Sequence, residues 1–133
     1  MTHPTASPDD DAAVRNAIAA LTRAQDQGRV EDLVALYAVD AVLELPGSEP
    51  IVGADALRAA FTEWVPTRPQ RHLVGNTLIT GAEDGEVQAV SDVVMFSRGS
   101  SGWAPRIVGS YTDTFRAVDG EWRLARRVTA FEL

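Results

Sequence analysis

The sequence predicts an α+β domain in which helices lie on one face of a mostly antiparallel sheet. Up to about residue 65, apolar residues recur at the spacing of a helix. After Pro69 the spacing changes to two, the period of a strand. Asp119-Gly120 separates two β-rich segments and is a specific hairpin signal. Helices followed by an antiparallel meander are typical of an α+β domain.

Three helices are predicted in the first half of the chain. The first covers 11–27, where an apolar stripe has helical spacing: Val14, Ile18 and Leu21. Aspartates precede it and favour the positive helix end, and Gly28 supplies a stop. The second covers 30–37, and the third runs from about Ala54 to Val65, before Pro66.

Five strands are predicted: a short one at 41–45, and then 71–80, 87–98, 106–118 and 121–131. A Gly/Ser-rich loop over 98–105 is expected to hold Trp103, as a lid or an interface anchor. Residues 1–10 are polar and contain two prolines, so we expect a disordered tail before a single domain over 11–133.

The composition excludes several kinds of chemistry. The chain has no cysteine, and all twelve basic residues are arginine, which removes thiolate nucleophiles and lysine Schiff bases. His72 is the one histidine outside the expected tail, so we expect no metal site and no cofactor. The net charge of −7 argues against nucleic acid as a partner.

Other features bear on location and surface. No segment reaches the roughly 18 apolar residues of a membrane span, and the N-terminus does not resemble a secretion signal. We therefore expect a cytoplasmic protein with no membrane partner. A local basic cluster is assigned to a solvated outer strand face or an oligomer contact: Arg116, Arg123, Arg126 and Arg127.

Several segments resemble the nuclear-transport-factor-2-like superfamily. They are residues 26–42 (DQGRVEDLVALYAVDAV), Gly53, and the ending Tyr111-x-Asp113 followed by Asp119-Gly120-x-Trp122-Arg123. The resemblance spans roughly 12–131. It implies a strongly curved, cone-shaped sheet closed by three helices around an apolar pocket, and commonly a homodimer through the outer sheet face. Because this fold hosts many activities, the resemblance says less about function.

Within the superfamily, the chain is most similar to the SnoaL-like and scytalone-dehydratase-like group. That group pairs an Asp at the end of the first helix with a His on the first long strand, and Asp26 and His72 match these positions. The two tyrosines that scytalone dehydratases use to hold a water correspond to Gln25 and Leu45. The pair is present and the water-holding tyrosines are absent.

Two other groups fit less well. Ketosteroid isomerase has its base at the position of Leu45 and its oxyanion-hole Tyr at Leu21, and only Asp113 matches its second oxyanion-hole acid. That enzyme is a worked example of an acid kept protonated in an apolar site. Limonene-type epoxide hydrolases need an Arg two residues before an Asp on a strand, and no predicted strand has this pattern.

His72 and Asp26 each admit a structural and a catalytic interpretation. By alternation, His72 shares a strand face with Val74, Asn76 and Leu78, so it is either a satisfied core residue or a general base. Asp26 is either a solvated residue of the last helical turn or a carboxylate that orients the imidazole. The resemblance favours the catalytic interpretation of both.

Five further residues are candidates for substrate binding. Tyr111 and Asp113 share a strand face, where Asp113 is either a pocket donor or an outward residue displaced by a bulge. Asn76 could orient a substrate oxygen or bond to backbone. Tyr37 and Trp64 are candidates for core or pocket wall.

The expected function is a cofactor-independent enzyme for a small apolar, cyclic, polyketide- or steroid-like substrate. It would remove a proton next to a carbonyl or hydroxyl and so dehydrate, cyclise or isomerise. The alternatives are a ligand-binding or assembly domain without chemistry and, less favoured, a non-catalytic oxygenase subunit.

Overall fold

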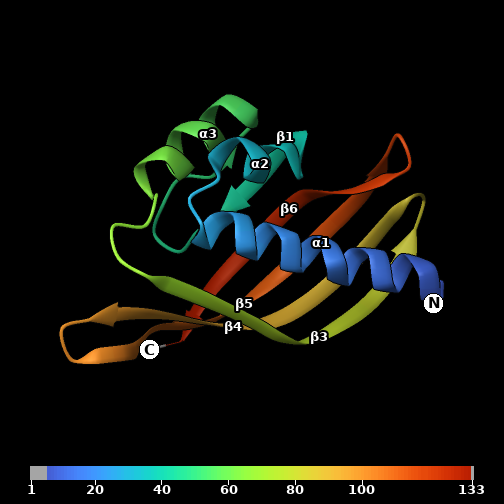
Figure 1. Cartoon of the computed structure of the whole chain (residues 1–133). Coiled ribbons are helices and arrows are strands. Elements are labelled where there is room, and N and C mark those ends of the chain that lie inside the picture. The colour runs from blue at the N-terminus through green and yellow to red at the C-terminus, as the bar shows by residue number, and fades with distance from the viewer. Residues whose placement is uncertain (1–5, 133) are drawn as a thin grey trace.

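The computed structural model describes residues 6–132 and confirms the α+β prediction (Figure 1). The elements follow in the order α1 (Pro8–Asp26), α2 (Val30–Ala35), β1 (Tyr37–Glu44), β2 (Ile51–Val52), α3 (Ala54–Glu63), β3 (Gln70–Glu83), β4 (Glu86–Gly99), β5 (Gly102–Val118) and β6 (Glu121–Glu132). The helices therefore belong to the first half of the described chain and the long strands to the second.

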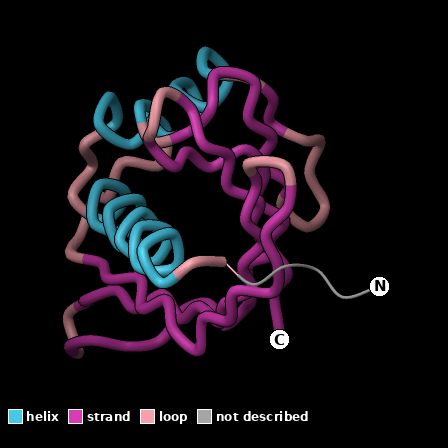
Figure 2. The backbone as a smooth tube through the Cα atoms, turned by 90° about the vertical axis from the view of Figure 1, so that its right-hand side faces the viewer, coloured by secondary structure: helices cyan, strands magenta, loops and turns pink. Residues whose placement is uncertain are grey.

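The six strands form one sheet in the order β2-β1-β6-β5-β4-β3. β3 to β6 make an antiparallel meander, and β1 pairs with β6 in the parallel direction. The sheet curves strongly, and α1 lies across its concave side (Figure 2). The concave face is therefore the one that can enclose a pocket.

The core lies between α1 and this concave face. The predicted stripe of α1 is buried: Val14, Ile18, Leu21 and also Ala24. It packs in one cluster with side chains of α2, α3 and the sheet, including Leu33, Leu57, Phe61, Val87, Phe115 and Leu124. Full burial of such aliphatic or aromatic side chains contributes about 1.5–3 kcal/mol each.

α1 begins earlier than the sequence suggested. Ser7 is the N-cap and accepts a hydrogen bond from the backbone N–H of Asp10 at 3.1 Å, and Pro8 occupies the first turn. The prediction of a disordered tail over 1–10 is therefore wrong for Pro8–Asp10. Residues 1–5 lie outside the described part of the chain.

The second helix is shorter than predicted, and β1 is longer. Tyr37 starts β1, where it pairs with Leu124 of β6, and the N–H of Leu124 donates to Leu36 O at 3.0 Å. This parallel pairing between distant segments ends the helical pattern after Ala35. The spacing of apolar residues along 30–37 does not reveal this pairing of β1 with β6.

The predicted loop over 98–105 is instead a hairpin. Gly99 pairs with Gly102, so β4 and β5 continue to a two-residue turn. Trp103 stands on β5, half exposed, with the Arg71 guanidinium 6.0 Å from its ring centroid. Within residues 6–132, no helix has the length and apolar content to cross a membrane.

Candidate active site

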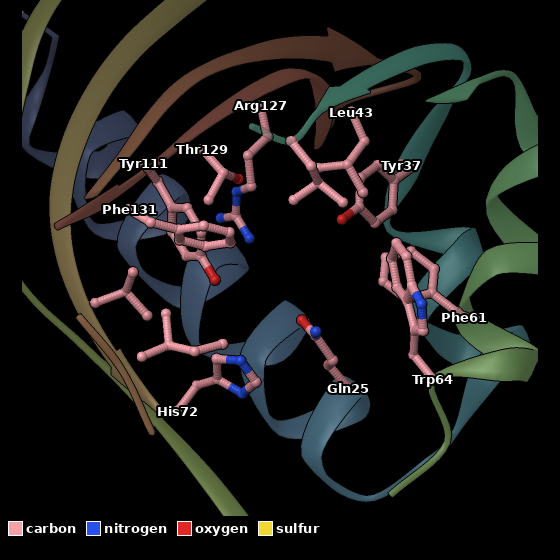
Figure 3. Close-up of a pocket in the computed structure, with 13 residues that line it drawn as sticks. Gln25, Tyr37, Leu43, Phe61, Trp64, His72, Tyr111, Arg127, Thr129 and Phe131 are labelled. Carbon is pink, nitrogen blue, oxygen red and sulfur yellow. The ribbon is translucent and has the colours of Figure 1, made fainter. Parts of the chain in front are cut away.

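A pocket of about 170 Å³ lies between the concave face of the sheet and the helices (Figure 3). The helices contribute Gln25, Phe61 and the neighbouring Trp64, and the sheet contributes Tyr37, Leu43, His72, Val93, Ile107, Tyr111, Arg127, Thr129 and Phe131, with Leu45 just after β1. Trp64 and Phe131 are 41% and 42% exposed, so they lie at the entrance. Most of the wall is apolar, and the polar groups are few.

The structure brings Asp26 and His72 together. The His72 Nδ1 and Asp26 Oδ1 atoms are 2.6 Å apart, and the backbone N–H of His72 donates to Asp26 Oδ2 at 2.6 Å. The Gln70 amide donates to Oδ1 at 3.1 Å. The carboxylate at the end of α1 is thereby held by two residues of β3. The Asp26 side chain is only 5% exposed and the His72 side chain only 10% exposed.

Burial alone would raise the pKa of Asp26, but three effects hold that pKa below its ordinary value of 3.8. They are the hydrogen bonds from the ring and backbone of His72, the charge interaction with His72, and the hydrogen bond from Gln70. Asp26 is therefore ionised at neutral pH and only accepts hydrogen bonds. The proton between the two groups belongs to Nδ1, and a neutral imidazole presents its unprotonated Nε2.

Asp26→Asn should destabilise the fold by about 1–3 kcal/mol at about pH 7, because an amide cannot accept all three hydrogen bonds. A carboxyl group whose pKa is lowered by folding stabilises fully above its unfolded value and loses that contribution as pH falls through its folded value. The difference between wild type and variant should therefore shrink below about pH 4.

Urea unfolding midpoints at about pH 7 and about pH 3 measure this difference. Asp55→Asn is the matched control, because the Asp55 side chain is exposed. A difference independent of pH would show that the carboxylate charge contributes nothing.

Three of the predicted binding residues line the pocket: Tyr37, Trp64 and Tyr111. Asp113 lies behind the wall and is 1% exposed. Its two carboxylate oxygens accept from Nε and Nη2 of Arg127 at 2.8 and 2.9 Å. Asp113 faces inward as one interpretation predicted, but Arg127 stands where Asp113 was expected to meet a ligand.

Arg127 is a pocket residue that the sequence interpretation placed wrongly. It is 4% exposed, and its guanidinium carbon lies 3.8 Å from the Tyr111 ring centroid. Burial would lower the pKa of Arg127, but the charge and hydrogen bonds of Asp113 raise it above the ordinary value. Arg127 is thus a permanent cation in the wall.

The rest of the predicted basic cluster does lie on the surface. Each side chain has its own carboxylate partner: Arg116 with Asp40, Arg123 with Glu121, and Arg126 with Glu44. Consecutive residues on a strand face opposite sides, so Arg126 and Arg127 could not both point outward. This alternation was the available signal for Arg127.

The prediction that Asn76 shares a face with His72 is wrong. The register of β3 against β4 shifts between Gly75 and Leu78, and Asn76 has a φ of 49°. This bulge turns Asn76 outward, where it is exposed and donates to Asp92 at 2.8 Å. The structure does not bring Asn76 to the pocket.

Gln25 and Leu45 also line the pocket. Both positions were noted as departures from scytalone dehydratases, and Leu45 also as a departure from ketosteroid isomerase, but neither was proposed as a site residue. Thr129 and Phe131 were not singled out, although they follow Arg127 at alternate positions on β6. In the described residues 6–132, no three His, Asp or Glu side chains gather as metal ligands would.

The curved sheet with helices on its concave side gives the chain an NTF2-like fold. The chain belongs to the SnoaL-like domain family, whose model matches residues 7–128. A search of curated protein sequences finds no match.

Solved structures of the same fold include three proteins from Novosphingobium aromaticivorans. One is described as an NTF2-like protein with a cystatin-like fold: TM-score 0.84, 24% identity, covering 92% of this chain and 82% of that one. A candidate scytalone dehydratase has a TM-score of 0.83 and 23% identity over 94% and 85% of the two chains. The β subunit of a candidate aromatic-ring-hydroxylating dioxygenase has a TM-score of 0.75 and 23% identity over 92% and 88%. At these identities the likeness concerns the fold.

Proposed function

We propose that this protein is a cofactor-independent enzyme of the lyase or isomerase type that removes a proton from a small cyclic substrate. The observation that carries the proposal is the buried Asp26–His72 pair, with 2.6 Å between Oδ1 and Nδ1, in which His72 lines an apolar pocket. An imidazole whose Nδ1 is held by a carboxylate can act as a general base through Nε2.

The chemistry follows from these groups. Nε2 of His72 takes a proton from the carbon next to a carbonyl, and the electron pair moves onto the carbonyl oxygen. Asp26 stabilises the imidazolium that results. If the substrate has a β,γ double bond, return of the proton to the γ carbon shifts that double bond and isomerises the substrate. If it has a β-hydroxyl, the imidazolium protonates the departing hydroxyl, a C=C bond forms and water is released. Attack of the enolate carbon on a second carbonyl closes a ring, and the alkoxide that forms takes the proton back from the imidazolium.

The size of the pocket narrows the substrate class. An apolar cavity of about 150 Å³ accommodates benzene, and this pocket has about 170 Å³. The part of the substrate that reacts is therefore about one ring in size. A polyketide- or steroid-like molecule with several fused rings would extend past Trp64 and Phe131 at the entrance.

The test is a panel of aryl ketones, hydroxy-ketones, polyketide-like and steroid-like compounds scored for binding and for chemical change. We expect at least one class to turn over with wild type and not with His72→Ala. Tight binding by wild type without chemical change in any compound of the panel would contradict the enzyme proposal.

Binding without chemical change would favour the second candidate function, a ligand-binding or assembly domain. For either function we propose a cytoplasmic location. One observation supports this candidate: a solved structure of the same fold is the β subunit of a candidate ring-hydroxylating dioxygenase. The same pocket then holds an apolar ligand without a base acting on it.

We also propose a homodimer through the outer face of the sheet. Register partners Leu78, Val90, Thr112 and Val128 form one row across four strands, and Leu73, Val94 and Val108 form another. Leu73, Leu78, Val108 and Val128 are exposed although they are large and apolar. Such a surface is typical of an interface.

Light scattering at micromolar concentration should report twice the chain mass of 14.3 kDa. Leu78→Asp should shift the result toward the monomer, because it places a charge within the apolar row. A wild-type mass near 14.3 kDa would exclude the dimer at that concentration.

A further inference from the structure

Three hydrogen-bond donors lie on the side of the pocket that faces His72 and Gln25. The hydroxyls of Tyr37 and Tyr111 and the guanidinium of Arg127 point toward the middle of the pocket (Figure 3). The three side chains are 5%, 7% and 4% exposed. They come from three strands that lie in the order β1-β6-β5 in the sheet. β5 and β6 form a hairpin, whereas β1 is distant from both in the sequence.

These donors are incompletely used within the protein. Among residues 6–132, neither tyrosine hydroxyl makes a side-chain hydrogen bond, and Asp113 occupies Nε and Nη2 of Arg127 but leaves Nη1. Among the described residues, the one fully buried side-chain nitrogen or oxygen atom without a hydrogen-bond partner is Thr129 Oγ1, and Thr129 also lines this pocket. Three donors that have no partner within this part of the chain, around one space and next to the unpaired Thr129 hydroxyl, favour a ligand that accepts hydrogen bonds.

The protonation of the three groups decides what the ligand must offer. Burial raises the pKa of Tyr37 and of Tyr111 above the ordinary value of 10.0, even though the nearby Arg127 acts in the opposite direction. Arg127 keeps its charge because Asp113 pairs with it. Both hydroxyls therefore retain their protons and can donate. Because Arg127 can only donate, a ligand oxygen that meets all three groups must accept a hydrogen bond from Arg127.

The charge balance favours a carbonyl over a carboxylate. Arg127 is already paired with the Asp113 carboxylate at 2.8 Å, and the Asp26 carboxylate lies behind His72. A ligand with its own full negative charge would add to the negative charge that Asp113 and Asp26 already place near the pocket. A neutral carbonyl does not, and it gains charge only during the reaction, when preorganised donors stabilise it most.

We propose that Tyr37, Tyr111 and Arg127 form a carbonyl-binding subsite, and that the natural ligand is a cyclic or aryl ketone. With its oxygen at the three donors, the carbon next to the carbonyl is directed to the opposite side, toward His72. When His72 removes a proton from that carbon, the donors stabilise the enolate oxygen. The catalytic part rests on the proposed function, whereas ketone binding does not.

The experiment uses acetophenone labelled with ¹³C at the carbonyl, and ethylbenzene as the ligand that keeps the ring but lacks the oxygen. Hydrogen bonds from the donors should move the bound carbonyl resonance downfield. Tyr37→Phe and Tyr111→Phe should each weaken acetophenone binding about 3- to 10-fold and reduce that shift. Ethylbenzene affinity should stay unchanged.

Both variants should fold, because neither removes a hydrogen bond within the described protein. Arg127→Met combined with Asp113→Leu removes the guanidinium without leaving a carboxylate unpaired. It should abolish most of the shift. Thr80→Val is the matched control, since it removes an exposed hydroxyl from β3 outside this pocket.

His72→Ala separates this proposal from the previous one. It should leave acetophenone binding and the carbonyl shift in place even if no compound is ever turned over. Equal affinity of wild type and both Tyr→Phe variants for acetophenone would overturn the subsite. So would an unshifted carbonyl resonance, or the failure of acetophenone to bind at millimolar concentration.

Discussion

His72→Ala is expected to lower turnover of any reactive compound by about 10²- to 10⁴-fold, the usual contribution of a positioned general base. The fold should survive, because Asp26 still accepts from the backbone N–H of residue 72 and from Gln70. Single-turnover rates measure the effect, with melting temperatures as the control for folding. Unchanged turnover in a folded variant would remove His72 from the mechanism.

The pH dependence of turnover belongs to the same prediction. Histidine is the side chain that ordinarily changes charge between about pH 5 and 8, and only the unprotonated ring can accept a proton. Wild-type turnover should therefore fall as pH is lowered through this range. The residual activity of His72→Ala should not show that decline.

Breaking the Arg127–Asp113 ion pair should have the largest effect on stability. Both side chains are at most 4% exposed, so Arg127→Met leaves a buried carboxylate without its partner. The expected loss is about 3–5 kcal/mol, out of a typical total of about 5–15 kcal/mol. Urea unfolding of the single variants Arg127→Met and Asp113→Leu measures it.

The double variant is the decisive control. Replacing both members of a buried pair with apolar residues is often neutral or stabilising, so Arg127→Met with Asp113→Leu should regain most of the lost stability. Losses that simply add would mean that the two residues contribute independently and that the pair is not coupled.

The sequence predicted the elements whose signals are local. The stripe Val14–Ile18–Leu21 and the stop at Gly28 define α1, and Asp119-Gly120 defines the last hairpin. Tyr37 was assigned to a helix because its strand character depends on parallel pairing with β6, which lies more than 80 residues away. Pairing at that distance leaves no local pattern.

The residues of the candidate site also differ in whether the sequence alone could place them correctly. Asp26 and His72 were found through a resemblance, and the structure places them in contact. Asn76 was misplaced because a bulge reverses the alternation of β3. Arg127 was grouped with its surface neighbours because net charge says nothing about which face a residue occupies, although strand alternation does.

Deuterium exchange at the carbon next to a carbonyl tests most directly whether His72 removes a proton. Aryl ketones would be incubated with the protein in D₂O and followed by proton NMR, without any need to know the natural product. We expect exchange to be accelerated by wild type, strongly reduced in Asp26→Asn and absent in His72→Ala. Ketones that bind in the pocket but exchange no faster than in buffer, or that exchange equally fast with His72→Ala, would contradict it.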